Sequence, residues 1–140
     1  MSIEHSKTLV RHLIEEVINQ GKVDLVDEFL ASDYVEREEL PPGMPRDREA
    51  LKLLVPMMSA AFPDFKATII DLIAEGDKVV AQLRWTGTQK GEWMGMPPSG
   101  KSMSIAVIDI FRVDGGKIVE HWGVMDSASM MQQLGAMPAP

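Results

Sequence analysis

Apolar and polar residues alternate with a helical period early in the chain and with a strand period in its second half. Between residues 3 and 19 the apolar positions recur every three or four residues, which predicts an amphipathic helix ended by Gly21. A shorter helix is predicted over 23–30, and a brief extended segment over 33–38. Residues 40–46, LPPGMPR, hold three prolines and a glycine, so we expect a loop there.

A third helix is predicted between Asp47, a suitable N-cap, and about Ala61. Pro56 lies inside this helix and cannot donate a backbone hydrogen bond, so we expect a kink or a break there. The remaining chain is rich in β-branched residues separated by glycine turns. We expect four strands, over 66–74, 78–88, 103–113 and 117–125, then a helix over 127–134 and a frayed tail over 135–140.

Helices that precede a series of hairpins predict an α+β fold, with the helices segregated to one face of an antiparallel sheet. The turns over 75–77 and 115–116 are short, as in hairpins, and the sheet must curve around the helices. A chain of 140 residues is long enough for one well-buried core. We therefore expect a single domain over 1–140.

Composition excludes several functions. The 21 acidic and 14 basic residues give a net charge of −7, which argues against a nucleic-acid partner because such proteins cluster Lys and Arg. Cysteine is absent, so disulfides, thiolate catalysis and cysteine-bound zinc are excluded. No apolar run reaches the roughly 18 residues of a membrane span, and no secretion signal is seen. We expect a cytoplasmic protein without membrane contact.

Asp126 is the leading candidate for chemistry, because it is a carboxylate at the end of an apolar strand. Burying it there would be costly unless it were paired, neutralised or used. Strand alternation places it on the face of Trp122 and Val124, opposite to His121. The alternative is structural, since the carboxylate could cap the helix that follows. Both roles stay open at this point.

His121 is the only histidine outside the first predicted helix, and imidazole is the usual proton shuttle near neutral pH. Because its side chain alternates away from Asp126, we interpret it as a buried or interface histidine. His5 and His12 lie on the polar face of the first helix, where we expect them to be solvated.

Charges inside the apolar strands form a second group of candidates. Asp109, Arg112 and Arg84 could hold a water molecule or an anion, or could be ion pairs at a strand edge or an interface. The loop over 87–101 is rich in Gly and Pro but carries large apolar side chains, so it could cover an apolar pocket or pack against the domain or a second subunit. These side chains are Trp93, Met94 and Met96.

Taken together, the motifs resemble the SnoaL-like polyketide cyclases, within the nuclear-transport-factor-2-like superfamily. The resemblance covers nearly the whole chain. It rests on Asn19-Gln20-Gly21, on DYV at 33–35, AFPD at 61–64 and EGDKV at 75–79, on the loop GTQKGEWMGMPPSGK, and on GGKIVEHWGVMD at 115–126.

The resemblance implies a conical barrel, formed by a strongly curved antiparallel or mixed sheet around N-terminal helices, with an internal apolar pocket. It also implies a homodimer or higher homo-oligomer, and a cofactor-free intramolecular aldol condensation whose catalytic aspartate falls by motif on Asp126. Many members have histidine where this chain has Arg37 and Gln89. Gln89 could donate to an enolate oxygen and Arg37 could stabilise one by charge.

The leading hypothesis is therefore an enzyme of the aldol cyclase or isomerase type, with no cofactor and no metal, acting on a small apolar or aromatic carbonyl compound. One alternative is a module that binds such a ligand without reaction. Another is an epoxide-hydrolase-like activity in which Asp109 joins Asp126 in one cavity. In the leading hypothesis Asp126 is the acid/base, and the substrate contacts are Trp122, Gln89, Arg37, Arg112, Trp93, Met94 and Met96.

Overall fold

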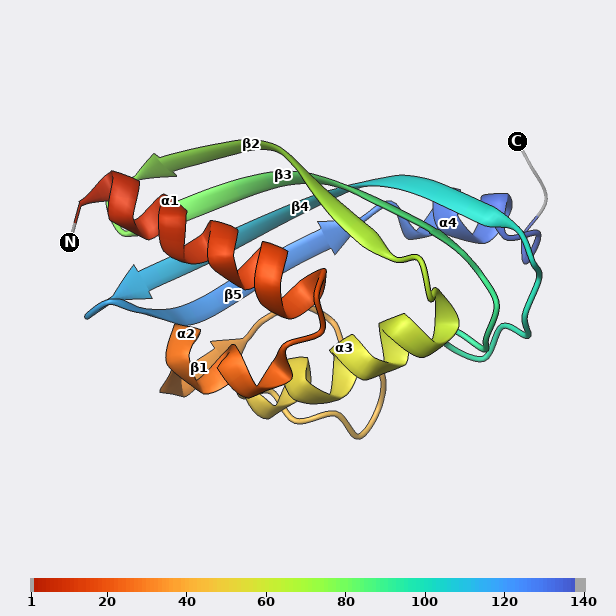
Figure 1. Ribbon diagram of the computed structural model, residues 1–140, viewed down its shortest axis with the longest axis horizontal. Helices are drawn as coiled ribbons and strands as arrows, with labels where there is room; N and C mark the ends of the chain where they lie inside the picture. Colours follow the sequence, from red (N-terminus) through yellow and green to blue (C-terminus); the bar gives the residue numbers. More distant parts are fainter. Residues whose placement is uncertain (1, 138–140) are drawn as a thin grey trace.

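Helices cover one face of a single curved sheet in the computed structural model, which describes residues 2–137 (Figure 1). The helical segments are α1 (Ile3–His12), a π-helical continuation η1 (Leu13–Ile18), a 3-10 turn η2 (Val23–Leu25), α2 (Val26–Phe29), α3 (Glu49–Ala61) and α4 (Ser127–Gln133). The strands are β1 (Leu30–Glu36), β2 (Lys66–Glu75), β3 (Lys78–Thr88), β4 (Ser102–Asp114) and β5 (Lys117–Met125). The predicted α+β class is confirmed.

The sheet is mixed and has the strand order β1-β5-β4-β3-β2. The long strands β2 to β5 pair antiparallel, whereas β1 pairs parallel to β5. Within residues 2–137 the edge strands β1 and β2 do not pair with each other, so the sheet is not closed. The expected barrel is therefore corrected to an open curved sheet. The four long strands agree with their predicted bounds to within about one residue, whereas the extended segment predicted over 33–38 is β1, which begins and ends two to three residues earlier.

The helices depart from the predicted pattern in three places. The first helix widens into a π-helical turn from Leu13, and the second gives way to β1 at Leu30. α3 runs across Pro56 without interruption, so the predicted break is wrong. Pro56 is exposed, while Val55 and Met58 on either side of it are buried and hold both halves of α3 against the core.

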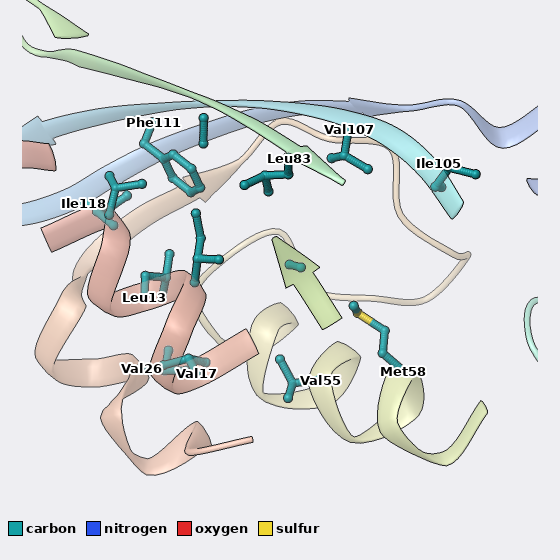
Figure 2. Packing of buried hydrophobic residues seen from close by; sticks show 14 of the residues in the cluster. Leu13, Val17, Val26, Val55, Met58, Leu83, Ile105, Val107, Phe111 and Ile118 are labelled. Atoms are coloured by element: carbon teal, nitrogen blue, oxygen red, sulfur yellow. The ribbon is translucent and has the colours of Figure 1, made fainter. Parts of the chain in front are cut away.

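The core lies between the helices and the inner face of the sheet, where Figure 2 shows side chains from η1, α3 and the strands converging. In β4 the inner row is buried and alternates with an outer row. Asp109 is the one polar residue in an inner row that otherwise consists of Met103, Ile105, Val107, Phe111 and Val113. A carboxylate in this row is positioned to face the helices rather than bulk solvent.

The last helix, α4, completes the edge of β4 beyond the end of β5. The Gln133 amide accepts from the Ser104 N–H at 2.6 Å and donates to the Ser104 carbonyl at 3.0 Å, as a neighbouring strand would. Residues 135–137 form a turn and a bend, and the rest of the predicted tail lies outside the described residues. Within 2–137, no helix combines the length and the apolar character needed to cross a bilayer.

Candidate active site

A cavity of about 1010 Å³ opens between the sheet, the helices η1 and α3, and the loop after β1. Most of its wall is apolar, and its polar groups gather where β1, β4 and β5 meet. The apolar wall includes Leu13, Ile14, Met58, Leu83, Trp85, Trp93 and Phe111, and the polar part includes Tyr34, Glu36, Glu38, Asp109 and His121. This is the general form of a small-molecule site, with apolar walls and a few convergent polar groups.

The short length of β1 creates the polar end of the cavity. Its pairing with β5 ends at Glu36, opposite His121, and the Arg37 N–H donates to the His121 carbonyl at 2.8 Å. Beyond this point the chain turns away into the loop over 37–46, which lines the cavity beside β5. Acidic side chains at the end of β1 thus meet the inner faces of β4 and β5.

His121 is held between two carboxylates. Its Nδ1 lies 2.6 Å from Glu36 Oε2 and its Nε2 lies 2.9 Å from Asp109 Oδ1. All three residues are buried. Burial alone would lower the pKa of His121, but the hydrogen bonds to Asp109 and Glu36 and their charges raise it to about 10. The imidazole is therefore a fixed cation at neutral pH, and the sequence-based interpretation of a plain buried histidine is too narrow.

Glu36 is the most fully hydrogen-bonded acid of the cluster. Its carboxylate accepts from the Tyr34 hydroxyl at 2.6 Å, from His121, and from the Glu38 backbone N–H at 3.1 Å. Burial would raise the pKa of Glu36, but these donors and the charge of His121 lower it below the usual value. The pKa of Tyr34 is raised by burial and by the neighbouring Glu36 charge, so its hydroxyl stays protonated as a donor.

Glu38 lies beside this ion network with a different balance of forces. Burial is the largest effect and raises the pKa of Glu38 to about 7; the His121 cation opposes this shift, while Asp109 and Glu36 add to it. Its carboxylate thus changes charge near neutral pH, in the range that suits a general acid or base.

The cluster also has the residue types of a metal site, since Glu36, Glu38 and His121 each bring one suitable atom within 4.8 Å of the others. Both nitrogens of His121, however, already face carboxylates, and a protonated imidazole has no lone pair to offer a cation. In this hydrogen-bonding state the residues fit an ion network and not a metal centre.

Asp126 has a different environment. It is exposed, and its Oδ1 accepts from the Ser129 N–H at 3.1 Å, which makes it the N-cap of α4. Its neighbours Met125 and Ser127 border the cavity, but Asp126 is not among the lining residues. It follows His121 by five residues, or about 16 Å of strand. The geometry favours the capping role, and the pair of Asp109 and Asp126 needed for the hydrolase alternative does not share the cavity.

The aromatic residues that were predicted to contact the substrate lie on two sides of the sheet. Trp93 is buried and lines the cavity, where its ring meets Phe62 edge to face with centroids 5.9 Å apart. Met94 also borders the cavity but is mostly exposed. Trp122 pairs with Ile110 and lies on the outer face with the Lys78 ammonium 5.6 Å from its ring centre; both Trp122 and Ile110 also border the cavity.

The other predicted contact residues differ in whether they line the cavity. Gln89 is fully buried but is not a lining residue; its amide donates to the Gly91 and Met96 carbonyls and braces the loop over 87–101. Met96 packs against the core, also outside the lining. Arg37 borders the cavity, whereas Arg112 does not. Both guanidinium groups donate from Nε to Glu120, at 2.7 and 3.0 Å.

Sequence reasoning missed Glu36, the last residue of β1, and Glu38, two residues beyond it. A signal was present, because Tyr34, Glu36 and Glu38 follow the period of two that places strand residues on one face. Asp109 likewise shares a period of two with Val107 and Phe111. The pattern identifies each row, but the covering of that row by helices is decided by the tertiary fold.

Comparison with known proteins gives one consistent family. The model of the SnoaL-like polyketide cyclase family matches residues 8–134. Nogalonic acid methyl ester cyclase of Streptomyces nogalater is 31% identical over 119 residues, covering 84% of this chain and 88% of that protein. Aklanonic acid methyl ester cyclase DnrD of Streptomyces peucetius is 33% identical over 131 residues, covering 91% and 88%.

Solved structures agree with this grouping. TsrD from Streptomyces laurentii superposes with a TM-score of 0.88 at 30% identity, covering 98% of this chain and 99% of its own. IdmH from Streptomyces antibioticus superposes with a TM-score of 0.80 at 34% identity, covering 93% and 98%. The fold is thus of the nuclear-transport-factor-2-like type, and the relatives support an enzyme of the cyclase type.

Proposed function

The chain belongs to the SnoaL-like polyketide cyclase family, and from this premise we propose that it catalyses a cofactor-independent, intramolecular aldol-type ring closure of a carbonyl compound. The observation that carries this proposal is the cluster of His121 with three carboxyl groups on the wall of an otherwise apolar cavity. Such a wall can bind an apolar multi-ring compound while the cluster exchanges a proton with it.

The reaction moves one proton and forms one carbon–carbon bond. A carboxylate takes a proton from the carbon next to a carbonyl, and the resulting enolate attacks a second carbonyl carbon of the same molecule. The new alkoxide then takes up the proton, so product and substrate have the same mass. His121 contributes by charge, because both its nitrogens are engaged, and a cation in a low-dielectric cavity stabilises a developing oxyanion.

Of the residues predicted to contact an oxygen of the substrate, Arg37 has the position that best suits this role. It borders the cavity, and the only hydrogen bond of its side chain within residues 2–137 is the one from Nε to Glu120. The terminal nitrogens of its guanidinium are therefore available to an oxygen of the substrate.

The proposal is tested with aklanonic acid methyl ester and nogalonic acid methyl ester as probes. We expect a ring-closed isomer of unchanged mass, formed faster than in buffer and followed by liquid chromatography with mass detection. His121→Asn should lower kcat by about 100-fold, whereas the exposed Glu75→Gln variant serves as control and should match the wild type. Saturable binding of both esters without any conversion would instead establish the non-catalytic ligand-binding alternative.

A homo-oligomer is a further part of the proposal. Exposed large apolar side chains on the sheet support it, since exposed apolar surface often marks a protein interface. They are Ile70, Ile73, Ile108 and Val124, with exposed fractions between 37% and 69%. Light scattering after size exclusion should give a multiple of the 15.5 kDa chain mass, and Ile73→Glu, which does not border the cavity, should reduce it; a monomer in dilute solution would contradict this part.

A further inference from the structure

The Glu38 carboxylate differs from the other acids of the cluster in its lack of donors. Glu36 accepts from Tyr34, His121 and a backbone N–H, and Asp109 accepts from His121. In the part of the chain that the structure describes, no donor hydrogen-bonds the Glu38 carboxylate, although the residue lines the cavity and is only partly exposed. It is the acid whose lone pairs remain available to a bound molecule.

The backbone of Glu38 is held on both sides. Its N–H donates to Glu36 Oε2 at 3.1 Å, and its carbonyl accepts from Arg46 Nη1 at 3.0 Å. One residue earlier, the Arg37 N–H is bonded to the His121 carbonyl of β5. A free carboxylate on a fixed backbone is the arrangement expected for a group that must meet a reacting atom in a defined place.

Gly123 provides the space that this carboxylate uses. It pairs with Asp109 on the inner face of β5, two residues after His121. A Cβ atom at this position would lie 2.5 Å from Asp109 Oδ1, 2.7 Å from Glu38 Oε1 and 3.1 Å from His121 Cε1. The first two separations are shorter than side-chain carbons tolerate, so any other residue here displaces an acid. The Glu38 carboxylate therefore packs against the backbone of Gly123, in the space that a side chain would otherwise fill.

We propose that Glu38 is the general acid/base of this site and that Gly123 admits its carboxylate; the proposal rests on the carbonyl chemistry given above. Glu38 breaks the C–H bond by taking the proton, the enolate forms the new C–C bond, and protonated Glu38 returns the proton to the alkoxide. His121, Glu36 and Asp109 are positioning residues that fix the surrounding charge. Asp126 has no part in the step.

The surrounding charges suit this role. Glu38 faces Glu36 from β1, Asp109 from β4 and the His121 cation from β5, and Arg46 reaches only its backbone. Burial and the two acids favour the protonated form, and the cation favours the ionised form, which together bring the pKa to about 7. Both forms are then populated near neutral pH, as a group that takes and returns one proton requires.

The test compares kcat for aklanonic acid methyl ester in the wild type, Glu38→Gln, Glu38→Asp, Gly123→Ala and Asp126→Asn, with Glu75→Gln as control. Glu38→Gln should lower kcat by about 10²–10⁴-fold with a small change in KM, and Glu38→Asp should keep part of the rate. Gly123→Ala should lower kcat at nearly unchanged stability. The wild-type rate should rise with pH through about 7, and this limb should vanish in Glu38→Gln.

Full turnover by Glu38→Gln, or loss of turnover in Asp126→Asn alone, would overturn the assignment while leaving the cyclase function intact. If the wild type converts neither ester, the proposed function fails, and Glu38 is then tested on the free protein by carboxyl ¹³C NMR. Its pKa should be about 7 and should fall in Gly123→Ala as the carboxylate moves toward water. A value near 4.5 in the wild type would contradict the inference.

Discussion

Two neighbouring parallel strands each end in acidic residues, and the two ends behave in opposite ways. β1 ends at Glu36, and Glu38 lies two residues beyond it; both are covered by the sheet and the cavity wall. β5 ends at Met125 and is followed by Asp126, which is exposed and caps α4. The register explains the difference, because Glu36 pairs with His121 while Asp126 follows His121 by five residues, just beyond the end of β5. The role of an acid at a strand end is therefore determined by the residues that cover it, and not by its position in the strand.

The largest effect should come from removing the His121 cation that Glu36 of β1 and Asp109 of β4 share. His121→Leu leaves Glu36 and Asp109 buried without their donor, so the free energy of unfolding at pH 7 should fall by about 3–5 kcal/mol. Urea denaturation measures this loss. The matched control is His12→Leu, because His12 lies 2.9 Å from Glu16 but is half exposed, and its removal should cost less than about 1 kcal/mol. Equal losses in both variants would contradict the contrast between covered and exposed acids.

A change of intermediate size in the free energy of unfolding should follow from replacing Glu38. Its pKa is about 7 in the folded chain against 4.5 for an ordinary glutamate, so the folded state holds its proton more tightly and loses stability as pH rises from about 4.5 to 7. Glu38→Gln removes this loss. It should stabilise the protein by about 2 kcal/mol at pH 8, after allowance for partial exposure, and by almost nothing at pH 4.5.

Urea denaturation of both proteins at the two pH values measures this difference, with Glu75→Gln as the exposed control. A gain of the same size at pH 4.5 and pH 8 would show that the effect is one of packing and not of charge. A stabilised but inactive Glu38→Gln protein would show that the acid is kept for its chemistry at a cost in stability.

The strands and the class of the fold were predictable because they follow from local sequence patterns. Glycine turns and period-two alternation gave β2 to β5, and alternation correctly separated Trp122 from His121. Which face points inward was not predictable from β5, since both of its faces carry apolar residues. That choice is made by the helices, which cover one face of the sheet (Figure 1). His121 is buried, whereas Trp122 is partly exposed.

The site was predicted less well for the same reason. Asp126 stood out because it interrupts an apolar run, but interruption of a pattern marks the end of a strand as well as a catalytic acid. Glu36 and Glu38 lie in a polar stretch, EREE, whose composition is that of an ordinary solvated segment. Their burial depends on contacts with Asp109 and His121, more than 70 residues away in the chain, and such contacts leave no local signal.

The smallest loss of stability should come from replacing Asp126, the exposed acid that follows β5. Asp126→Ala removes the acceptor for the Ser129 N–H and should cost about 1 kcal/mol of stability, measured by thermal unfolding. Asp126→Asn should cost only a few tenths of a kcal/mol, because an Asn side chain accepts the same hydrogen bond. A loss in Asp126→Asn as large as that in Asp126→Ala would mean that the charge itself matters there, because Asn keeps the acceptor and loses only the charge. Near-equality of Asp126→Asn with the wild type, next to a strongly pH-dependent gain in Glu38→Gln, would show that the two strand ends differ as their coverage predicts.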